Sequence, residues 1–215
     1  MDAVVFDMDG VLIDSEHVWD EIRERLAREW GGRYSPAAQR AMMGMSSVEW
    51  SRYMHDELGI PQTPPEIDDE VVRRMLARYR DELPVVPGAL AAVSRLHEAG
   101  LVLAVASSSN RPLIDTVLDS AGVASFFAVT VSSEEVSRGK PAPDVYLEAA
   151  RRLGVPAARC AAIEDSASGI RSAAAAGMRV LAYPNLRYPP APDVLELADA
   201  VLESLDELTP ELVRS

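Results

Sequence analysis

Residues 3–10 read Ala-Val-Val-Phe-Asp-Met-Asp-Gly, and this short stretch decides the fold. Its apolar half predicts a buried strand, and the turn pair Asp9-Gly10 predicts that the strand opens into a loop. Polar residues that follow a buried strand lie at its carboxyl end, where open parallel sheets bind their ligands. We therefore expect Asp7 and Asp9 at the ligand-binding edge of a sheet.

From Pro87 onward, helix-like segments alternate with short apolar runs. The runs occupy residues 101–105, 127–131, 160–163 and 179–182, and a final strand is expected near 200–202. Four of the intervening helices end in a glycine, which closes a helix in the left-handed conformation: Gly100, Gly122, Gly154 and Gly177. This alternation predicts an α/β protein with a Rossmann-like parallel sheet, helices on both faces, and residues 4–6 as a central strand.

Residues 15–82 have a different, purely helical pattern. Apolar residues recur at spacings of three and four in three successive groups: Trp19, Ile22, Leu26 and Trp30; Trp50, Met54 and Leu58; Val72, Met75, Leu76 and Tyr79. All three tryptophans and five of the eight methionines lie in this segment, which indicates an apolar interior of its own. We expect an all-helical cap domain at 15–82, inserted after the first strand of a catalytic core formed by 1–14 and 83–215.

The charge balance excludes one class of partner. The chain of 215 residues has 34 acidic and 21 basic side chains, a net charge of -13, and Lys140 is its single lysine. Such a chain offers no basic face for nucleic acid. No apolar run approaches the roughly 20 residues that cross a bilayer, and the lone Cys160 excludes an intrachain disulfide. We expect a cytoplasmic globular protein, a monomer or small homo-oligomer, that binds neither nucleic acid nor membrane.

Polar groups follow four of the predicted strands in order: residues 7–10, 107–110, 139–141 and 164–166. Each group alone has an ordinary structural explanation, as a turn, a helix cap, a pair of first-turn acids or a surface lysine. Together they bring carboxylates, hydroxyls with backbone amides, and one ammonium to a single edge of the sheet. This combination favours a phosphoryl-transfer site.

Four segments resemble the motifs of the haloacid dehalogenase superfamily. They are Phe6–Ser15 (FDMDGVLIDS), Ser107, Gly139–Asp144 (GKPAPD) and Glu164–Ile170 (EDSASGI). More narrowly, the chain resembles the β-phosphoglucomutase-like phosphatases from Val4 to about Ala182. The resemblance implies a Mg²⁺-dependent phosphatase that hydrolyses a small phosphorylated metabolite, such as a sugar phosphate or a phosphoglycolate-like ester, through an aspartyl-phosphate.

Chemistry and resemblance assign the same roles to the two aspartates. Asp7 is expected to attack phosphorus and form the aspartyl-phosphate, which splits hydrolysis into two easier steps. Asp9 is expected to protonate the leaving oxygen and then to deprotonate the attacking water. Ser107 and the amide of Ser108 should hold a phosphate oxygen, while Lys140 neutralises the same group.

The metal ligands follow from the resemblance. It implies that the Asp7 carboxylate, the backbone carbonyl of Asp9 and Asp165 bind one Mg²⁺, with Glu164 helping directly or through water. Hard oxygen ligands suit this ion. A dehalogenase has no need of Asp9, Glu164 and Asp165, so these acids count against haloacid hydrolysis.

Two alternative functions stay open. In the sugar phosphomutase a histidine of the early cap helix gates the general acid, and Trp19 stands at that position here. The mutase also has a basic residue in its cap loop, whereas residues 42–50 contain none. A phosphatase is therefore favoured over a phosphomutase, and the complete set of polar residues argues against a non-catalytic binding module.

The cap contributes candidate residues whose roles the sequence leaves open. Four apolar side chains either line the space around the leaving group or pack inside the cap: Met42, Met43, Met45 and Trp50. His17 either faces the leaving group or lies on the surface.

Overall fold

The computed structural model describes residues 1–43 and 45–215, and these residues form one parallel sheet flanked by helices. The strand order is β3-β2-β1-β4-β5-β6, and every neighbouring pair is parallel. The strands are β1 (Ala3–Phe6), β2 (Val102–Ser107), β3 (Phe127–Ser132), β4 (Cys160–Glu164), β5 (Arg179–Ala182) and β6 (Ala200–Val201). The predicted α/β class, the parallel sheet and the central first strand are confirmed.

The middle of the sheet is apolar because helices cover both of its faces. All four residues of β1 are buried. Phe6 stands level with Val105 of β2 and Ile163 of β4, so the carboxyl ends of the three middle strands meet at one edge.

Two strands extend further than the sequence predicted. Ser107 and Glu164 were expected to follow their strands, but each is the last residue of one. Both side chains are fully buried, and each residue pairs with the next strand, Ser107 with Ser132 and Glu164 with Ala182. The ladder continues through these polar residues because their side chains find partners inside the protein.

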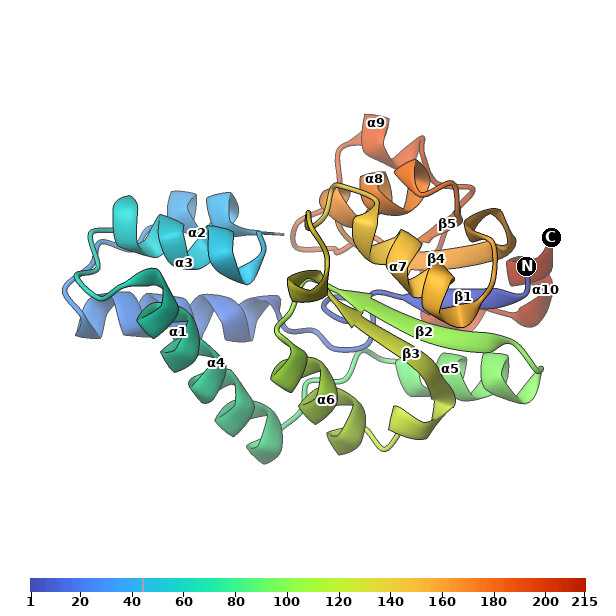
Figure 1. The fold of residues 1–215 in the computed structure, drawn as a ribbon, viewed down its shortest axis with the longest axis horizontal. Coiled ribbons are helices and arrows are strands. Elements are labelled where there is room, and N and C mark those ends of the chain that lie inside the picture. The colour runs from blue at the N-terminus through green and yellow to red at the C-terminus, as the bar shows by residue number, and fades with distance from the viewer. Residues whose placement is uncertain (44) are drawn as a thin grey trace.

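The helices of the core divide between the two faces of the sheet (Figure 1). One face is covered by α5 (Ala89–Glu98) and α6 (Arg111–Ser120), and the other by α7 (Asp144–Leu153) and α8 (Ala167–Ala175). Two short helices, α9 (Pro192–Leu195) and α10 (Pro210–Arg214), lie nearer the C-terminus. The four predicted helix-ending glycines all have φ between 68° and 79°, which confirms the left-handed helix ends.

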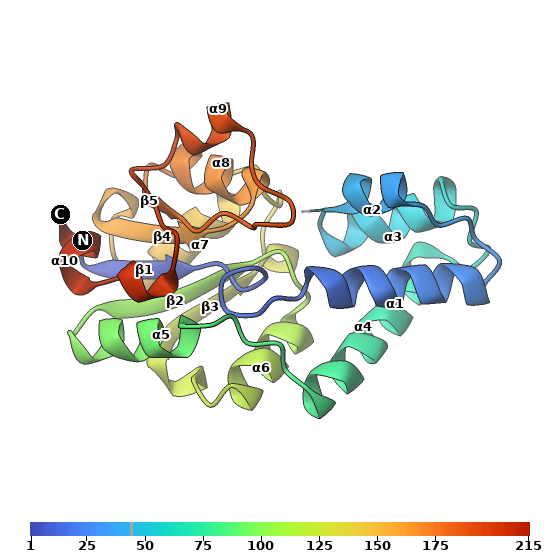
Figure 2. The same ribbon diagram turned by 180° about the vertical axis from the view of Figure 1, so that it is seen from behind.

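Between β1 and α5 the chain forms a helical insertion (residues 16–81). Its elements are α1 (Glu16–Glu29), α2 (Pro36–Met42), α3 (Ser47–Asp56) and α4 (Pro64–Asp81). Gly44, which falls within the predicted cap, lies outside the described residues. The insertion stands beside the carboxyl edge of the sheet, as both views show (Figures 1 and 2).

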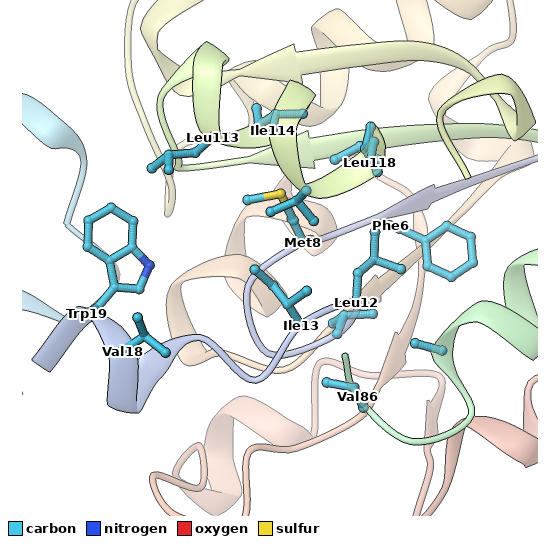
Figure 3. Packing of buried hydrophobic residues seen from close by; sticks show 14 of the residues in the cluster. Phe6, Met8, Leu12, Ile13, Val18, Trp19, Val86, Leu113, Ile114 and Leu118 are labelled. Atoms are coloured by element: carbon cyan, nitrogen blue, oxygen red, sulfur yellow. The ribbon is translucent and has the colours of Figure 1, made fainter. Parts of the chain in front are cut away.

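The apolar core continues from the sheet into the insertion. Val18 and Trp19 of α1 belong to the same buried cluster as Met8, Ile13 and residues of α6 (Figure 3). Where the chain enters and leaves the insertion, Ile13 and Val85 form an antiparallel bridge. Among the residues that the structure describes, none of the helices is long and apolar enough to span a bilayer.

Candidate active site

A cavity of about 390 Å³ lies between the carboxyl edge of the sheet and the helical insertion. Its floor includes Asp7, Asp9, Lys140 and Asp165, which come from three separate segments after β1, before α7 and after β4. The parallel topology produces this convergence, because β1 lies between β2 and β4 in the sheet. Ser108 lines the cavity as well, so five of the predicted site residues share it.

Lys140 joins two of the predicted carboxylates. Its Nζ atom donates to Oδ1 of Asp7 at 2.7 Å and to Oε1 of Glu164 at 2.6 Å. Its side chain is only 3% exposed. The hydroxyl of Tyr146 also donates to Oε1 of Glu164, at 2.7 Å. Burial alone would lower the pKa of Lys140, but the charges of Asp7 and Glu164 outweigh burial and raise it, so the ammonium stays charged.

Three buried carboxylates face one another around this lysine. Each of Asp7, Glu164 and Asp165 offers an oxygen, and these atoms lie within 4.8 Å of one another. Burial raises the pKa of Asp7 to about 8, with Lys140 opposing the shift and Glu164 adding to it. Burial, followed by the charges of Glu164 and Asp7, raises the pKa of Asp165 well above its usual range. One ammonium does not neutralise three carboxylates, and a divalent cation would relieve the repulsion.

Two glycines make room for these acids. A Cβ atom at Gly10 would overlap the carboxylate of Asp165, and one at Gly169 would overlap that of Glu164. Gly10 also has a φ of 88°, in the left-handed region. The close approach of backbone to carboxylate explains why the resembling motifs have glycine at both positions.

The carboxylate of Asp9 points to a separate set of partners. It accepts hydrogen bonds from Ser15 Oγ at 2.5 Å, Ser109 Oγ at 2.7 Å and Trp19 Nε1 at 3.2 Å. Its oxygens are not among the three that group around Lys140. The carboxylate of Asp9 is thus held apart from the acidic group.

The serines after β2 take different positions. Ser108 and Ser109 line the cavity. Ser107 is fully buried, and its Oγ accepts from the Ser109 amide at 3.0 Å and makes a long 3.4 Å contact with Asp9. The sequence did not single out Ser15 or Ser109, because the spacing of residues does not show which hydroxyl turns toward Asp9.

The insertion forms the opposite wall of the cavity. Met42, Met43 and Met45 line it together with Trp19. Trp50 is buried against Trp19, with ring centroids 6.0 Å apart. The four apolar candidates of the insertion therefore differ in position. The three methionines line the cavity, whereas Trp50 packs inside the insertion. His17 is 41% exposed and lies 4.0 Å from Asp14, in agreement with the surface interpretation.

Direct hydrogen bonds join the insertion to the core. Ser47 Oγ donates to Asn110 Oδ1 at 2.9 Å, and Asn110 Nδ2 donates to Asp68 at 3.1 Å. On the other side of the cavity, Gln39 Nε2 donates to the hydroxyl of Tyr188 at 2.6 Å. The insertion is therefore held against the cavity on two sides.

A family model described as haloacid dehalogenase-like hydrolase matches residues 1–177. The chain belongs to this family. It is 32% identical over 210 residues to hexitol phosphatase B of Escherichia coli, a match that covers 96% of this chain and 94% of that protein. It is 33% identical over 204 residues to a bifunctional riboflavin kinase/FMN phosphatase of Arabidopsis thaliana, covering 94% of this chain but only 53% of that longer protein.

A solved structure gives the same result for the fold. CbbY from Rhodobacter sphaeroides, determined in complex with phosphate, matches with a TM-score of 0.88 and 25% identity over 100% of both chains. The resemblance stated from the motifs is thereby confirmed, and the chain is an enzyme of the hydrolase class.

Proposed function

We propose that the protein is a phosphatase that hydrolyses a small phosphomonoester through an aspartyl-phosphate on Asp7. The observation that carries the proposal is the position of Asp7, on the cavity floor with Lys140 at 2.7 Å and the carboxylate of Asp9 nearby in the same cavity. A phosphatase needs a fixed carboxylate nucleophile, a proton donor and local positive charge, and these three residues supply them.

In the first step, an oxygen of Asp7 forms a bond to phosphorus while the bond to the alcohol oxygen breaks. Asp9 gives its proton to that alcohol oxygen, and the alcohol leaves. In the second step Asp9 takes a proton from water, whose oxygen attacks phosphorus and releases Asp7 and inorganic phosphate. The hydrogen bonds from Ser15, Ser109 and Trp19 hold Asp9 in one orientation for both transfers.

The acidic group fits a Mg²⁺ ion. Asp7, Glu164 and Asp165 would hold it, together with the backbone carbonyl of Asp9, because clustered hard oxygens suit this cation. When bound, the ion offsets the repulsion between a carboxylate nucleophile and a phosphate dianion. Lys140 adds a fixed positive charge beside Asp7, and the Ser108 amide and the Ser107 hydroxyl are the remaining proposed phosphate contacts.

The helical insertion is proposed to act as a cap domain. This domain would consist of residues 15–82 and would exclude water from the reacting phosphate. The relatives are named for small phosphorylated substrates, among them a hexitol phosphatase and an FMN phosphatase. A sugar phosphate or a phosphoglycolate-like ester would fit a cavity of about 390 Å³. A cytoplasmic location and a monomeric or small homo-oligomeric state complete the proposal.

The test uses p-nitrophenyl phosphate. Turnover is expected with Mg²⁺ and not with EDTA, and Asp7→Asn is expected to lower kcat by at least a thousandfold while leaving thermal unfolding within a few degrees of the unsubstituted protein. Unchanged turnover in Asp7→Asn would contradict the nucleophile assignment. Assaying a hexose 1-phosphate for both free phosphate and the 6-phosphate separates hydrolysis from phosphomutase activity.

A further inference from the structure

Arg23 is a buried cation in the wall of the cavity. It belongs to α1, is 8% exposed and lines the cavity together with residues of the floor. Its guanidinium carbon lies 4.6 Å from the ring centroid of Trp19 and 4.8 Å from that of Trp50. The two indoles hold the planar group by cation–π contact.

The charge of Arg23 has no protein partner in residues 1–43 and 45–215. Two other cations line the cavity, but Lys140 is paired with Asp7 and Glu164, and Arg171 lies 3.7 Å from Asp193. For Arg23 the described residues provide neither a hydrogen bond nor an ion pair, and its Nε atom is buried without a partner. The charges of Glu16, then Asp9 and Asp20, act on Arg23 from a distance, but none of these acids forms an ion pair with it. A buried, unpaired guanidinium is costly unless a ligand pairs with it.

The position of Arg23 shows which part of a substrate it would meet. Trp19 and Arg23 are four residues apart and lie on the same face of α1. Trp19 donates to the carboxylate of Asp9, the group that would protonate the leaving oxygen. Arg23 therefore lies one helical turn beyond the tryptophan that contacts the proposed proton donor. The phosphate would lie at Asp7 and Lys140 and the leaving oxygen at Asp9, so a group carried by the leaving alcohol would extend toward Arg23.

We propose that Arg23 binds a second anionic group, a carboxylate or a phosphate, carried by the leaving group of the substrate. This inference rests on the proposed phosphatase function and narrows its substrates to phosphomonoesters of acidic alcohols. A guanidinium suits this role because its planar set of N–H donors matches the oxygens of both anions. The cation–π contacts with Trp19 and Trp50 position the guanidinium without using its N–H donors, which stay available to the ligand.

The experiment compares three esters with one three-carbon skeleton: glycerol 3-phosphate, 3-phosphoglycerate and glycerol 1,3-bisphosphate. They differ only in a neutral hydroxyl, a carboxylate or a second phosphate at the far carbon. The wild-type enzyme is expected to show a kcat/KM at least tenfold higher for one of the anionic esters than for glycerol 3-phosphate. The ester with the higher kcat/KM, 3-phosphoglycerate or glycerol 1,3-bisphosphate, identifies whether Arg23 binds a carboxylate or a phosphate.

In Arg23→Gln this anionic-to-neutral ratio is expected to fall at least tenfold. Arg25→Gln is the matched control, because Arg25 lies on the same helix, is 73% exposed and pairs with Glu29; it should keep the wild-type ratio. A purely structural role for Arg23 would lower turnover of all three esters together and leave the ratio unchanged. If Arg23→Gln does not fold, Arg23→Lys, which loses the planar set of donors, should lower the ratio at least threefold.

The outcomes separate this inference from the proposed function. Equal kcat/KM for the three esters in the wild type, or an unchanged ratio in the folded Arg23 variant, overturns the role of Arg23. Hydrolysis of p-nitrophenyl phosphate without hydrolysis of either anionic ester overturns it as well, and the phosphatase proposal then stands. Failure to hydrolyse any phosphate ester with Mg²⁺ overturns both.

Discussion

Lys140 links the chemistry of the site to the stability of the fold. Its ammonium lies between two buried carboxylates, Asp7 and Glu164, at 2.7 and 2.6 Å. Removing one member of a buried charged group leaves the others uncompensated, which typically costs about 3–5 kcal/mol. The single lysine of the chain therefore compensates the buried acids in the absence of substrate, in addition to its proposed role in binding phosphate.

For Lys140→Met we expect a loss of activity of at least a hundredfold and a fall in the free energy of unfolding of about 3 kcal/mol in metal-free buffer. Urea unfolding with and without Mg²⁺ measures the second effect. Arg138→Met, two residues away and 71% exposed in its pair with Asp144, is the control and should change stability by less than about 0.5 kcal/mol. Equal stability of the two variants would show that Lys140 does not compensate the acids.

At the level of single residues, the sequence predicted the types of group in the site better than their orientations. The positions of Asp7 and Asp165, directly after β1 and β4, follow from apolar runs that any parallel sheet would bury. The side chain of Ser109 points toward Asp9, and that of Arg23 lines the cavity. Both orientations depend on tertiary packing between α1 and the edge of the sheet. No local spacing encodes such contacts.

The helices and strands that the sequence predicted are those in which apolar residues form a continuous run or recur at helical spacing. Strands β1, β2, β4 and β5 and the long helices α1 and α4 were expected because each buries a continuous run or face. The short helix α2 was not, since only Ala38 and Met42 of its seven residues are buried. Its N-terminus depends instead on a cap, in which Ser35 Oγ accepts from the Ala38 amide at 3.2 Å.

The contact between α4 and α6 contains an acid whose charge opposes folding. Asp68 of α4 accepts a hydrogen bond from Asn110, the N-cap of α6. Burial raises the pKa of Asp68 from 3.8 to about 6; the Asn110 hydrogen bond opposes the shift, and the charge of Glu134 adds to it. Because this pKa is higher in the folded than in the unfolded state, the folded protein holds the proton more tightly. Ionisation of Asp68 thus lowers stability as the pH rises from about 4 to about 6.

Asp68→Asn should remove this pH dependence, because the amide oxygen still accepts from Asn110 and carries no charge. A two-unit shift corresponds to at most about 3 kcal/mol, and partial exposure to solvent reduces the expected gain at pH 7 to about 1 kcal/mol. Chemical unfolding at pH 4 and pH 7 measures the free energy of unfolding of the variant and of the wild type. The variant is expected to be more stable than the wild type at pH 7 only. An equal difference at both values would contradict a charge effect.

For the whole molecule, the important arrangement is the insertion standing over the cavity. Asn110 contacts the insertion on one side and Tyr188 contacts it on the other, through Gln39. Tyr188 lies in the segment between β5 and α9, and it also lines the cavity. The sequence predicted that the insertion begins at residue 15, but it did not predict which segment of the core meets the insertion from the far side.

Tyr188→Phe tests whether this contact favours the closed arrangement. The substitution removes the hydroxyl that accepts from Gln39 at 2.6 Å, and a hydrogen bond of this kind contributes about 1 kcal/mol. The equilibrium constant for closure should fall about fivefold, so KM for p-nitrophenyl phosphate should rise by up to about that factor while kcat changes by less than about twofold. Tyr183→Phe is the control, because Tyr183 lies in the same segment but outside the cavity lining, and it should keep the wild-type KM. Equal KM values for both variants would show that the contact between Gln39 and Tyr188 does not control closure.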